Sequence, residues 1–252
     1  MNKEIDKIIF KSDVLKNKTI VISGAGSGIG RQAAKSFSLH GANLILLSKN
    51  IEKLETLYDE IVKEKEKNVI IQPINYEIAE EKDFEEIILA IKSEYPSIDG
   101  LLNNAGVLGE KKPLEQYDYA TWKNVLKVNI DASFLLTKSL LPLLKGSKNS
   151  SIIFTSSGVG RRGRAYWGAY SISKFATEAM MQIFSEELQN TSSVRVNCIN
   201  PGAVRTKMRE AAYPAENPEA NPSADEIMKP YLYLMSDMST EINGQSIDAQ
   251  EH

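Results

Sequence analysis

Residues 19–30 read Thr19-Ile20-Val21-Ile22-Ser23-Gly24-Ala25-Gly26-Ser27-Gly28-Ile29-Gly30. The first five residues form a short run rich in β-branched apolar side chains, which predicts a buried strand. The glycines after it predict a tight turn, and a helical pattern then continues to about His40. A strand, a glycine turn and a helix in this order are typical of the first βα unit of a doubly wound sheet. The stretch therefore predicts an α/β fold.

The glycine spacing also predicts a phosphate-binding loop. Gly24, Gly28 and Gly30 fit G-x-x-x-G-x-G, whereas Ile29 occupies the place of the third glycine in G-x-G-x-x-G. Glycines allow the backbone to approach a pyrophosphate closely, and the start of the following helix offers amide donors and the positive end of the helix dipole. The alternative is a flexible turn without a ligand, but its position between a strand and a helix favours a phosphate loop.

The rest of the chain repeats this alternation without internal repeats. Further apolar strands are expected at 44–47, 69–71, 100–102, 151–155 and 194–199, and helices at about 51–65, 80–95, 117–144 and 170–189, the third of these broken or bent near Pro142. Such strands predict a parallel sheet covered on both faces. We expect one Rossmann-type domain of about seven strands over residues 18–252, preceded by a loosely packed or frayed lead-in over 1–17. The proline-broken segment 207–223 is expected to be a substrate lid rather than disordered filler.

Composition excludes several function classes. The chain has 252 residues, 42% of them hydrophobic and 25% charged, with a formal net charge of −3, which is ordinary for a globular domain and unlike a basic nucleic-acid binder. We expect neither a membrane span nor a signal peptide. The lone Cys198 excludes an internal disulfide, and we expect a cytoplasmic protein. His40 and His252, the two histidines, match no metal-ligand spacing, so we expect no metal site and no Ser-His-Asp triad.

Proton transfer is therefore expected from another pair of side chains. Tyr170 and Lys174 stand four residues apart in a predicted helix, so they share one helix face, and Ser157 precedes the tyrosine by thirteen positions. A nearby cation lowers the pKa of a phenol, so we expect the pKa of Tyr170 to move from about 10 toward neutrality. Tyr119 and Lys123 have the same spacing but no such serine, and we interpret them as a solvated helix face.

The end of the second strand bears on the choice of coenzyme. A protein that binds NAD usually places an acidic residue there to hold the ribose 2′-hydroxyl. This chain has Ser48-Lys49-Asn50, where a lysine favours a 2′-phosphate. We therefore expect NADP(H) rather than NAD(H), with a solvated lysine as the alternative.

Together these residues resemble the short-chain dehydrogenase/reductase family over nearly the whole chain. The resemblance rests on the glycine loop, Asn103-Asn104-Ala105-Gly106, a helix asparagine (Asn129), Ser157 with Gly160, the Tyr170/Lys174 pair, and Pro201-Gly202-Ala203-Val204-Arg205-Thr206. It implies Asn129, Ser157, Tyr170 and Lys174 as catalytic residues. The coenzyme residues that follow from the motifs and their surroundings are Ser23, Gly24, Ser27, Gly28, Ile29, Gly30, Ser48, Lys49, Asn50, Asn75, Tyr76, Asn104, Ala105, Gly106, Tyr170, Lys174, Pro201, Gly202, Val204 and Thr206.

Two segments, 160–168 and 247–250, are similar to the bacterial YciK-like branch of that family. The chain departs from the family pattern at three places: Ser23 replaces a threonine, Asn75 and Tyr76 stand where an aspartate commonly meets the adenine, and Asp248-Ala249-Gln250 replaces Asp-Gly-Gly. The hydroxyl of Ser23 can substitute for that of threonine.

The resemblance implies an NADP(H)-dependent oxidoreductase that interconverts a carbonyl and an alcohol. Tyr170 would exchange the proton, Ser157 would stabilise the substrate oxygen, and Lys174 and Asn129 would complete a proton relay. A dinucleotide-binding sensor or scaffold without turnover, and an isomerase or dehydratase of the same fold, are the alternatives. The resemblance also implies a homodimer or homotetramer. Arg161, Arg162 and Arg164 could recognise an acidic substrate or a coenzyme phosphate, or form a solvated loop or a subunit contact.

Overall fold

The computed structural model describes residues 2–5, 7–64 and 68–250, and its strands lie close to where the sequence predicts them. The predicted helix end at Lys65, and His252, lie outside the described residues. The strands are β1 (Thr19–Ser23), β2 (Asn43–Ser48), β3 (Val69–Pro73), β4 (Gly100–Asn103), β5 (Ser150–Thr155), β6 (Val194–Asn200) and β7 (Ser246–Asp248).

Helices separate these strands along the chain. They are α1 (Asn2–Ile5), α2 (Gly28–Leu39), α3 (Ile51–Glu64), α4 (Glu81–Glu94), α5 (Tyr119–Leu126), α6 (Ala132–Lys145), α7 (Gly168–Leu188), α8 (Lys207–Ala212) and α9 (Met228–Met235). A π-helical segment, η2 (Lys127–Asp131), joins α5 to α6, and short 3-10 turns lie at Leu114–Gln116, Gly158–Gly160, Pro218–Ala220 and Asp237–Ser239. In the part of the chain that is described, no helix is long and apolar enough to cross a membrane.

The strands form one parallel sheet in the order β3-β2-β1-β4-β5-β6-β7. The predicted doubly wound sheet of about seven strands is thus confirmed. The order reverses direction between β1 and β4, and in such sheets ligands bind at this point, beyond the carboxyl ends of the strands. The glycine loop after β1 and the Asn104 segment after β4 meet there.

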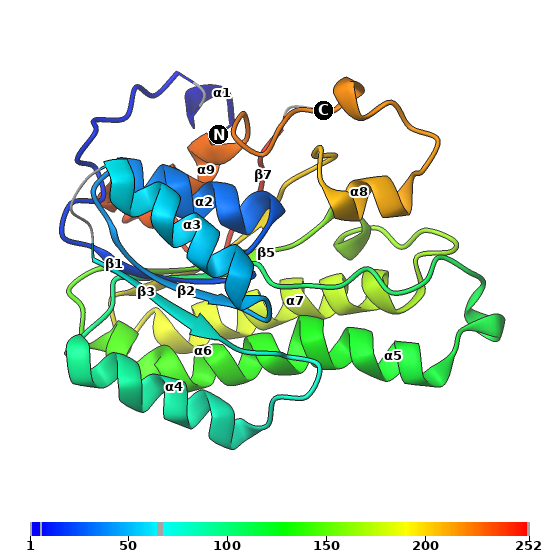
Figure 1. Cartoon of the computed structure of the whole chain (residues 1–252), viewed down its shortest axis with the longest axis horizontal. Coiled ribbons are helices and arrows are strands. Elements are labelled where there is room, and N and C mark those ends of the chain that lie inside the picture. Colours follow the sequence, from blue (N-terminus) through cyan, green and yellow to red (C-terminus); the bar gives the residue numbers. More distant parts are fainter. Residues whose placement is uncertain (1, 6, 65–67, 251–252) are drawn as a thin grey trace.

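Helices cover both faces of the sheet (Figure 1), and an apolar core lies between the helices and the sheet on each face. One core packs α2, α3 and α9 against one face, with Phe37, Leu54 and Tyr231 buried in it. The other packs α4, α6 and α7 against the opposite face, through residues such as Phe84 and Leu136. Strands buried on both faces must be apolar at nearly every position, which explains the continuous apolar runs in the sequence.

The long helix expected over 117–144 differs from the prediction in one respect. It is not broken at Pro142, because α6 runs through this residue to Lys145. The departure from regular geometry comes earlier, at the π-helical segment η2, which contains Asn129. Single π-helical turns often occur at functional sites because the extra residue turns a side chain toward the site.

The lead-in is packed more firmly than expected. Ile5 and Leu15 are buried, and Phe10 and Val14 pack against the core that contains α2 and α9. The Leu15 amide also donates to the carbonyl of His40 at the end of α2 (2.9 Å). These contacts attach the lead-in to the face of the sheet that α2, α3 and α9 cover.

Candidate active site

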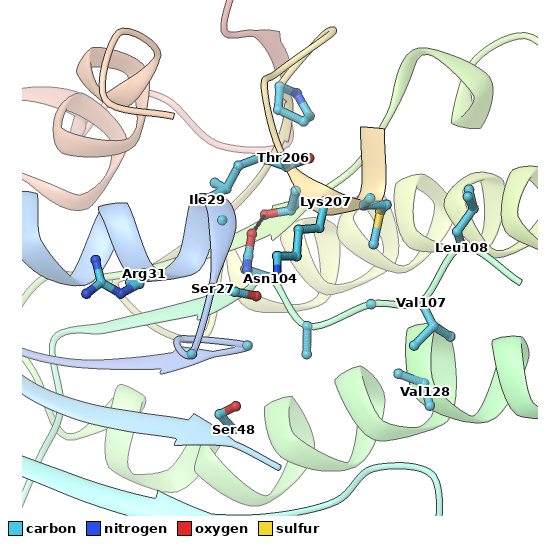
Figure 2. A pocket seen from close by; sticks show the side chains of 18 of the residues that line it. Ser27, Ile29, Arg31, Ser48, Asn104, Val107, Leu108, Val128, Thr206 and Lys207 are labelled. Carbon is cyan, nitrogen blue, oxygen red and sulfur yellow. Dashed lines mark hydrogen bonds between the residues drawn. The ribbon is translucent and has the colours of Figure 1, made fainter. Parts of the chain in front are cut away.

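A cleft of about 830 Å³ runs along the carboxyl edge of the sheet, from the ends of β2 and β3 past the glycine loop to the start of α7. Figure 2 shows its wall, with Ser27 and Ile29 at the start of α2, Ser48 at the end of β2, and Val107 and Leu108 beyond Asn104. Its volume lies within the usual range for small-molecule and cofactor sites. The cleft is the candidate active site.

Close packing at the glycine loop brings β1 and β4 together. A side chain at Gly24, where φ is +68°, would place its Cβ only 2.8 Å from the Ala105 Cα. A Cβ at Gly30 would lie 2.5 Å from both the Gly24 oxygen and the Asn104 Nδ2. The Ser23 hydroxyl accepts hydrogen bonds from the amides of Asn104 (3.0 Å) and Ala105 (3.1 Å). The Ser23 hydroxyl thus links the end of β1 to the segment after β4.

The start of α2 has amide donors to spare. Ser27 is the N-cap residue, but its side chain makes no capping hydrogen bond, and the first turn contains no acidic residue. Uncapped amides at the positive end of a helix dipole attract an anion. The loop therefore fits the diphosphate of a dinucleotide.

Most of the residues predicted for the site line this one cleft. They are Gly24, Ser27, Gly28, Ile29, Ser48, Lys49, Asn50, Asn75, Tyr76, Asn104, Ala105, Gly106, Ser157, Tyr170, Lys174, Pro201, Gly202, Val204 and Thr206. Ser23, Gly30 and Asn129 lie behind its wall, where their contacts fix the loops that face it.

Ser157, Tyr170 and Lys174 are brought together by the packing of the 3-10 turn after β5 on α7. A Cβ at Gly160 would lie 2.8 Å from the Lys174 backbone, so this glycine allows the serine loop to rest on the helix. Ser157 and Tyr170 line the same end of the cleft, and the serine side chain favours the ionised form of the phenol. Ser156, the neighbouring serine, is instead engaged by Glu178 (2.5 Å).

The electrostatics of the pair differ from the expectation. Burial raises the pKa of Tyr170 to about 12, and the nearby Ser157 side chain offsets only part of this rise. Lys174 does not lower it, because its ammonium donates to the Thr155 carbonyl (2.7 Å) and lies 5.6 Å from the centre of the tyrosine ring. Burial also lowers the pKa of Lys174 to about 8. The prediction that the pKa of Tyr170 moves toward neutrality is therefore wrong.

Asn129 joins the π-helical segment to the loop after β4 and to α7. Its side chain accepts from the Val107 amide (2.8 Å) and donates to the Val107 carbonyl (3.0 Å) and the Ser173 hydroxyl (2.9 Å). A Cβ at Gly106 would lie 3.3 Å from Asn129 and 3.9 Å from the Lys174 Nζ. Asn129 and Lys174 thus meet at the same glycine.

Tyr119 and Lys123 behave as the solvated pair that was expected. The tyrosine is 69% exposed and the lysine ammonium lies 4.8 Å from the centre of its ring. The two pairs have the same spacing, and burial distinguishes Tyr170 from Tyr119 in the structure as the upstream serine does in the sequence.

The adenosine end of the cleft contains a carboxylate that the second strand lacks. Glu77, which follows β3, pairs with Lys49 at 2.7 Å, and both side chains are partly exposed. Exposed pairs of this kind are weak, so Lys49 remains available to another anion. Tyr76 contributes little of its side chain to the cleft, because its ring is buried and stacks on Phe84.

The three arginines after Ser157 are not among the residues that line the cleft. Arg161 bonds to Asp248 (2.6 Å) and to the Ser246 hydroxyl (2.7 Å), and it approaches Glu178 (3.5 Å). It therefore ties the serine loop to β7. Arg162 and Arg164 are exposed.

Comparison with known proteins decides the family. The family model for short chain dehydrogenases matches residues 18–217. The chain belongs to this family.

Its relatives include the oxidoreductase YciK of Escherichia coli K12, which is 43% identical over 240 residues, covering 95% of this chain and 94% of YciK. The expected YciK-like branch is thus confirmed. A short chain dehydrogenase of Shigella flexneri 2a, solved in complex with NADP, is 42% identical with a TM-score of 0.93, over 96% of this chain and 100% of the other. One from Escherichia coli CFT073, solved with NADPH, is 43% identical with a TM-score of 0.92, at the same coverage.

Several lining residues of this short chain dehydrogenase escaped the sequence analysis. They include Arg31, Lys53 and Glu77 near the adenosine end, and Leu108, Lys207, Arg209 and Ala212 farther along the cleft. Trp167 and Met208, which the sequence left open between lining an apolar cavity and simple packing, also line the cleft. Lys53 could have been found, since it lies one helical turn after Asn50, whose side chain accepts from the Lys53 amide (2.8 Å). Lys207 directly follows the predicted Thr206. Arg209 and Ala212 lie in the segment 207–223 that was expected to be a lid. Arg31, Glu77 and Leu108 carry no local signal, because the tertiary fold brings them to the cleft.

Proposed function

We propose that the chain is an NADP(H)-dependent oxidoreductase that interconverts a carbonyl and an alcohol, with Tyr170 as the general acid and base. The observation that carries this proposal is that a single cleft joins the glycine loop to Ser157, Tyr170 and Lys174. A site for a dinucleotide and a set of groups that can move a proton thus share one space, as carbonyl reduction requires.

The residues of the cleft fit the coenzyme. The uncapped start of α2 and Thr206 suit its diphosphate, while Ser48, Lys49 and Lys53 suit a 2′-phosphate beyond the end of β2. The complexes of the Shigella flexneri and Escherichia coli dehydrogenases with NADP and NADPH support the choice of a phosphorylated dinucleotide. When bound, the coenzyme supplies or accepts the hydride, and the protein handles the proton.

Tyr170 suits the role of proton donor. Its pKa of about 12 keeps the phenol protonated at neutral pH, ready to protonate a substrate oxygen during reduction. Ser157, which lines the same end of the cleft, can donate to the same oxygen and stabilise its developing charge. Lys174, with a pKa near 8, can exchange a proton at physiological pH, and Asn129 beside it supports a relay toward solvent.

The substrate end of the cleft is mainly apolar. Val107, Leu108, Trp167, Met208 and Ala212 line it, and the Trp167 ring lies 5.7 Å from the ring of Tyr170. Such a wall favours a carbonyl compound with an apolar or planar group beside the reacting carbon. Residues 207–212 contribute α8 to this wall, which supports a lid role for the segment 207–223.

Two measurements test this function. Titration of the purified protein with NADPH and NADH, followed by nicotinamide fluorescence, should show tighter binding of NADPH. Tyr170→Phe should then reduce turnover of a carbonyl substrate by about 10²–10⁴-fold and leave NADPH binding nearly unchanged. Binding of neither coenzyme by cofactor-free protein would favour a scaffold, and product formation without net coenzyme consumption would favour an isomerase or dehydratase.

We also propose that the chain forms homo-oligomers in the cytoplasm. Phe134 on α6 and Ile172, Phe175 and Ile183 on α7 are 40–57% exposed although they are large and apolar. Exposed apolar groups on neighbouring helices favour a subunit contact. The single buried Cys198 fits a reducing compartment. Light scattering should give a mass of two or four chains, and a monomer at micromolar concentration would contradict the contact.

A further inference from the structure

A buried carboxylate lies behind the wall of the cleft. Glu178 is buried and is not among the residues that line the cleft. It follows Lys174 by one turn of α7, so the two side chains leave the helix on the same face. Carboxylates are seldom buried, because the loss of water is costly, and an apolar side chain of similar size often stabilises a core at least as well. Packing alone therefore does not explain Glu178.

The Glu178 carboxylate joins α7 to two other parts of the fold. Its Oε1 accepts from the hydroxyl of Ser156, which directly follows β5 (2.5 Å), and from the hydroxyl of Ser246 on β7 (2.8 Å). The Arg161 Nε lies 3.5 Å from the same oxygen. Hydrogen bonds to an ionised group are shorter and about twice as strong as those between neutral groups. One carboxylate thus attaches both ends of the segment 156–161 to α7.

Ser157 lies between these two points of attachment. The Ser156 amide donates to the Ile199 carbonyl on β6 (2.7 Å), so both the backbone and the side chain of Ser156 are held. The turn then closes through the Gly160 amide, which donates to the Ser157 carbonyl (2.8 Å). Because the peptide bond is planar, a fixed Ser156 leaves few positions for the residue that follows it. The carboxylate therefore limits where the Ser157 hydroxyl can lie.

We propose that Glu178 is a positioning residue for Ser157: by holding Ser156, it fixes the Ser157 hydroxyl on the side of the cleft that Tyr170 lines. The inference rests on the proposed function, because it gives Ser157 a role at the substrate oxygen. Glu178 lies behind the wall, so its effect on the reaction passes through Ser157. A misplacement of about 1 Å can cost about 10²-fold in rate. The effect therefore lies in kcat and not in the affinity for the coenzyme.

Steady-state kinetics test the effect on kcat. Consumption of NADPH is followed with phenanthrenequinone, a planar diketone that suits the apolar wall. Glu178→Ala and Ser156→Ala should each lower kcat by about tenfold and leave the Kd for NADPH unchanged. Glu178→Gln should keep most of the kcat, because its amide oxygen can still accept from Ser156. Glu186→Ala, at an exposed position two turns further along α7, is the matched control and should change neither constant.

A double-variant cycle separates positioning from a general loss of structure. Ser157→Ala alone should lower kcat by about 10²–10³-fold, since it removes a donor to the substrate oxygen. If Glu178 acts through the Ser157 hydroxyl, the addition of Glu178→Ala to Ser157→Ala should lower kcat no further. A general loss of structure would instead multiply the two losses, and this result would overturn the proposal.

Hydrogen exchange tests the positioning without a substrate. The amides of residues 157–161 should exchange faster in Glu178→Ala and in Ser156→Ala than in the wild type, while the amides of β1 stay protected. Ser156→Ala removes the same hydrogen bond without unpairing a buried charge, so it carries the test if Glu178→Ala does not fold. Unchanged kcat in both variants, or unchanged exchange in both, would overturn the proposal. A wild type that binds NADPH but reduces no carbonyl compound would instead contradict the proposed function, and the exchange would still decide the positioning.

Discussion

Replacing Lys174 with methionine should stabilise the fold while it removes turnover. The Lys174 side chain is buried, with a relative exposure of 5%, and burial lowers the pKa of its ammonium to about 8. In the unfolded chain the pKa is about 10.4. The unfolded state therefore binds more protons than the folded state between pH 8 and 10.4, so stability must rise with pH across this window. Below it, the folded protein bears the cost of burying a charge.

The size of the effect follows from the two pKa values. At 1.36 kcal/mol for each pH unit between them, the buried charge costs about 3 kcal/mol at pH 7. Methionine has a similar volume and no charge, but it loses the hydrogen bond to the Thr155 carbonyl, which is worth about 1 kcal/mol. The net gain at pH 7 is about 2 kcal/mol. For a domain of this size that gain corresponds to an increase in Tm of about 4–8 °C.

Urea unfolding at pH 7.0 and pH 9.5 provides the assay. The advantage of Lys174→Met over the wild type should shrink by about 2 kcal/mol between these pH values, because the wild-type lysine loses its proton in the folded state. Lys123→Met is the matched control, since Lys123 has the same spacing to a tyrosine on an exposed helix face, and it should change stability by less than about 0.5 kcal/mol. A Lys174→Met variant that is less stable than the wild type at pH 7 would refute the reasoning.

Two other substitutions test how the site is built. Gly30→Ala should abolish measurable NADPH binding and destabilise the fold by about 1–3 kcal/mol, because its Cβ would lie 2.5 Å from the Gly24 oxygen. Gly163→Ala is its control, since no atom lies within 4 Å of a Cβ added at that position. In thermal melts Gly30→Ala should lower the Tm, whereas Gly163→Ala should leave it unchanged. Arg161→Met should destabilise the fold by about 2 kcal/mol, because the buried Glu178 and the partly exposed Asp248 lose their cation. Arg162→Met on the exposed side of the same turn should have no effect in the same unfolding measurement.

Local patterns were sufficient for the fold and for most of the cleft. Apolar runs broken by glycine and proline predicted the strands, since a strand buried on both faces needs apolar residues along its length. The glycine loop was predicted for a similar reason, because the positive φ at Gly24 and Gly28 and the close approach of Ala105 allow almost no side chain there. Requirements of this kind act on residues that are neighbours in the chain, so the local sequence is enough to predict these elements.

Properties that depend on burial and on distant partners needed the tertiary structure. The sequence shows Tyr170 four residues from Lys174, but it does not show that burial raises the pKa of the phenol or that the ammonium turns to Thr155. It shows Arg161 beside the serine loop, but not Asp248, which lies 87 residues further along the chain. Desolvation and ion pairing depend on what surrounds a group in space.

Lys49 and Lys207 illustrate the division most clearly. The sequence alone showed that the end of the second strand offers a lysine and no acidic residue. It also showed that Lys207 directly follows the segment from Pro201 to Thr206. Only the tertiary structure brought Glu77, which follows the neighbouring strand β3, to Lys49, and turned Lys207 toward Ser27, more than 170 residues earlier in the chain. The sequence sets which charged groups are present. The strand order of the sheet sets which of them meet, and the strength of their interaction depends on distance and burial.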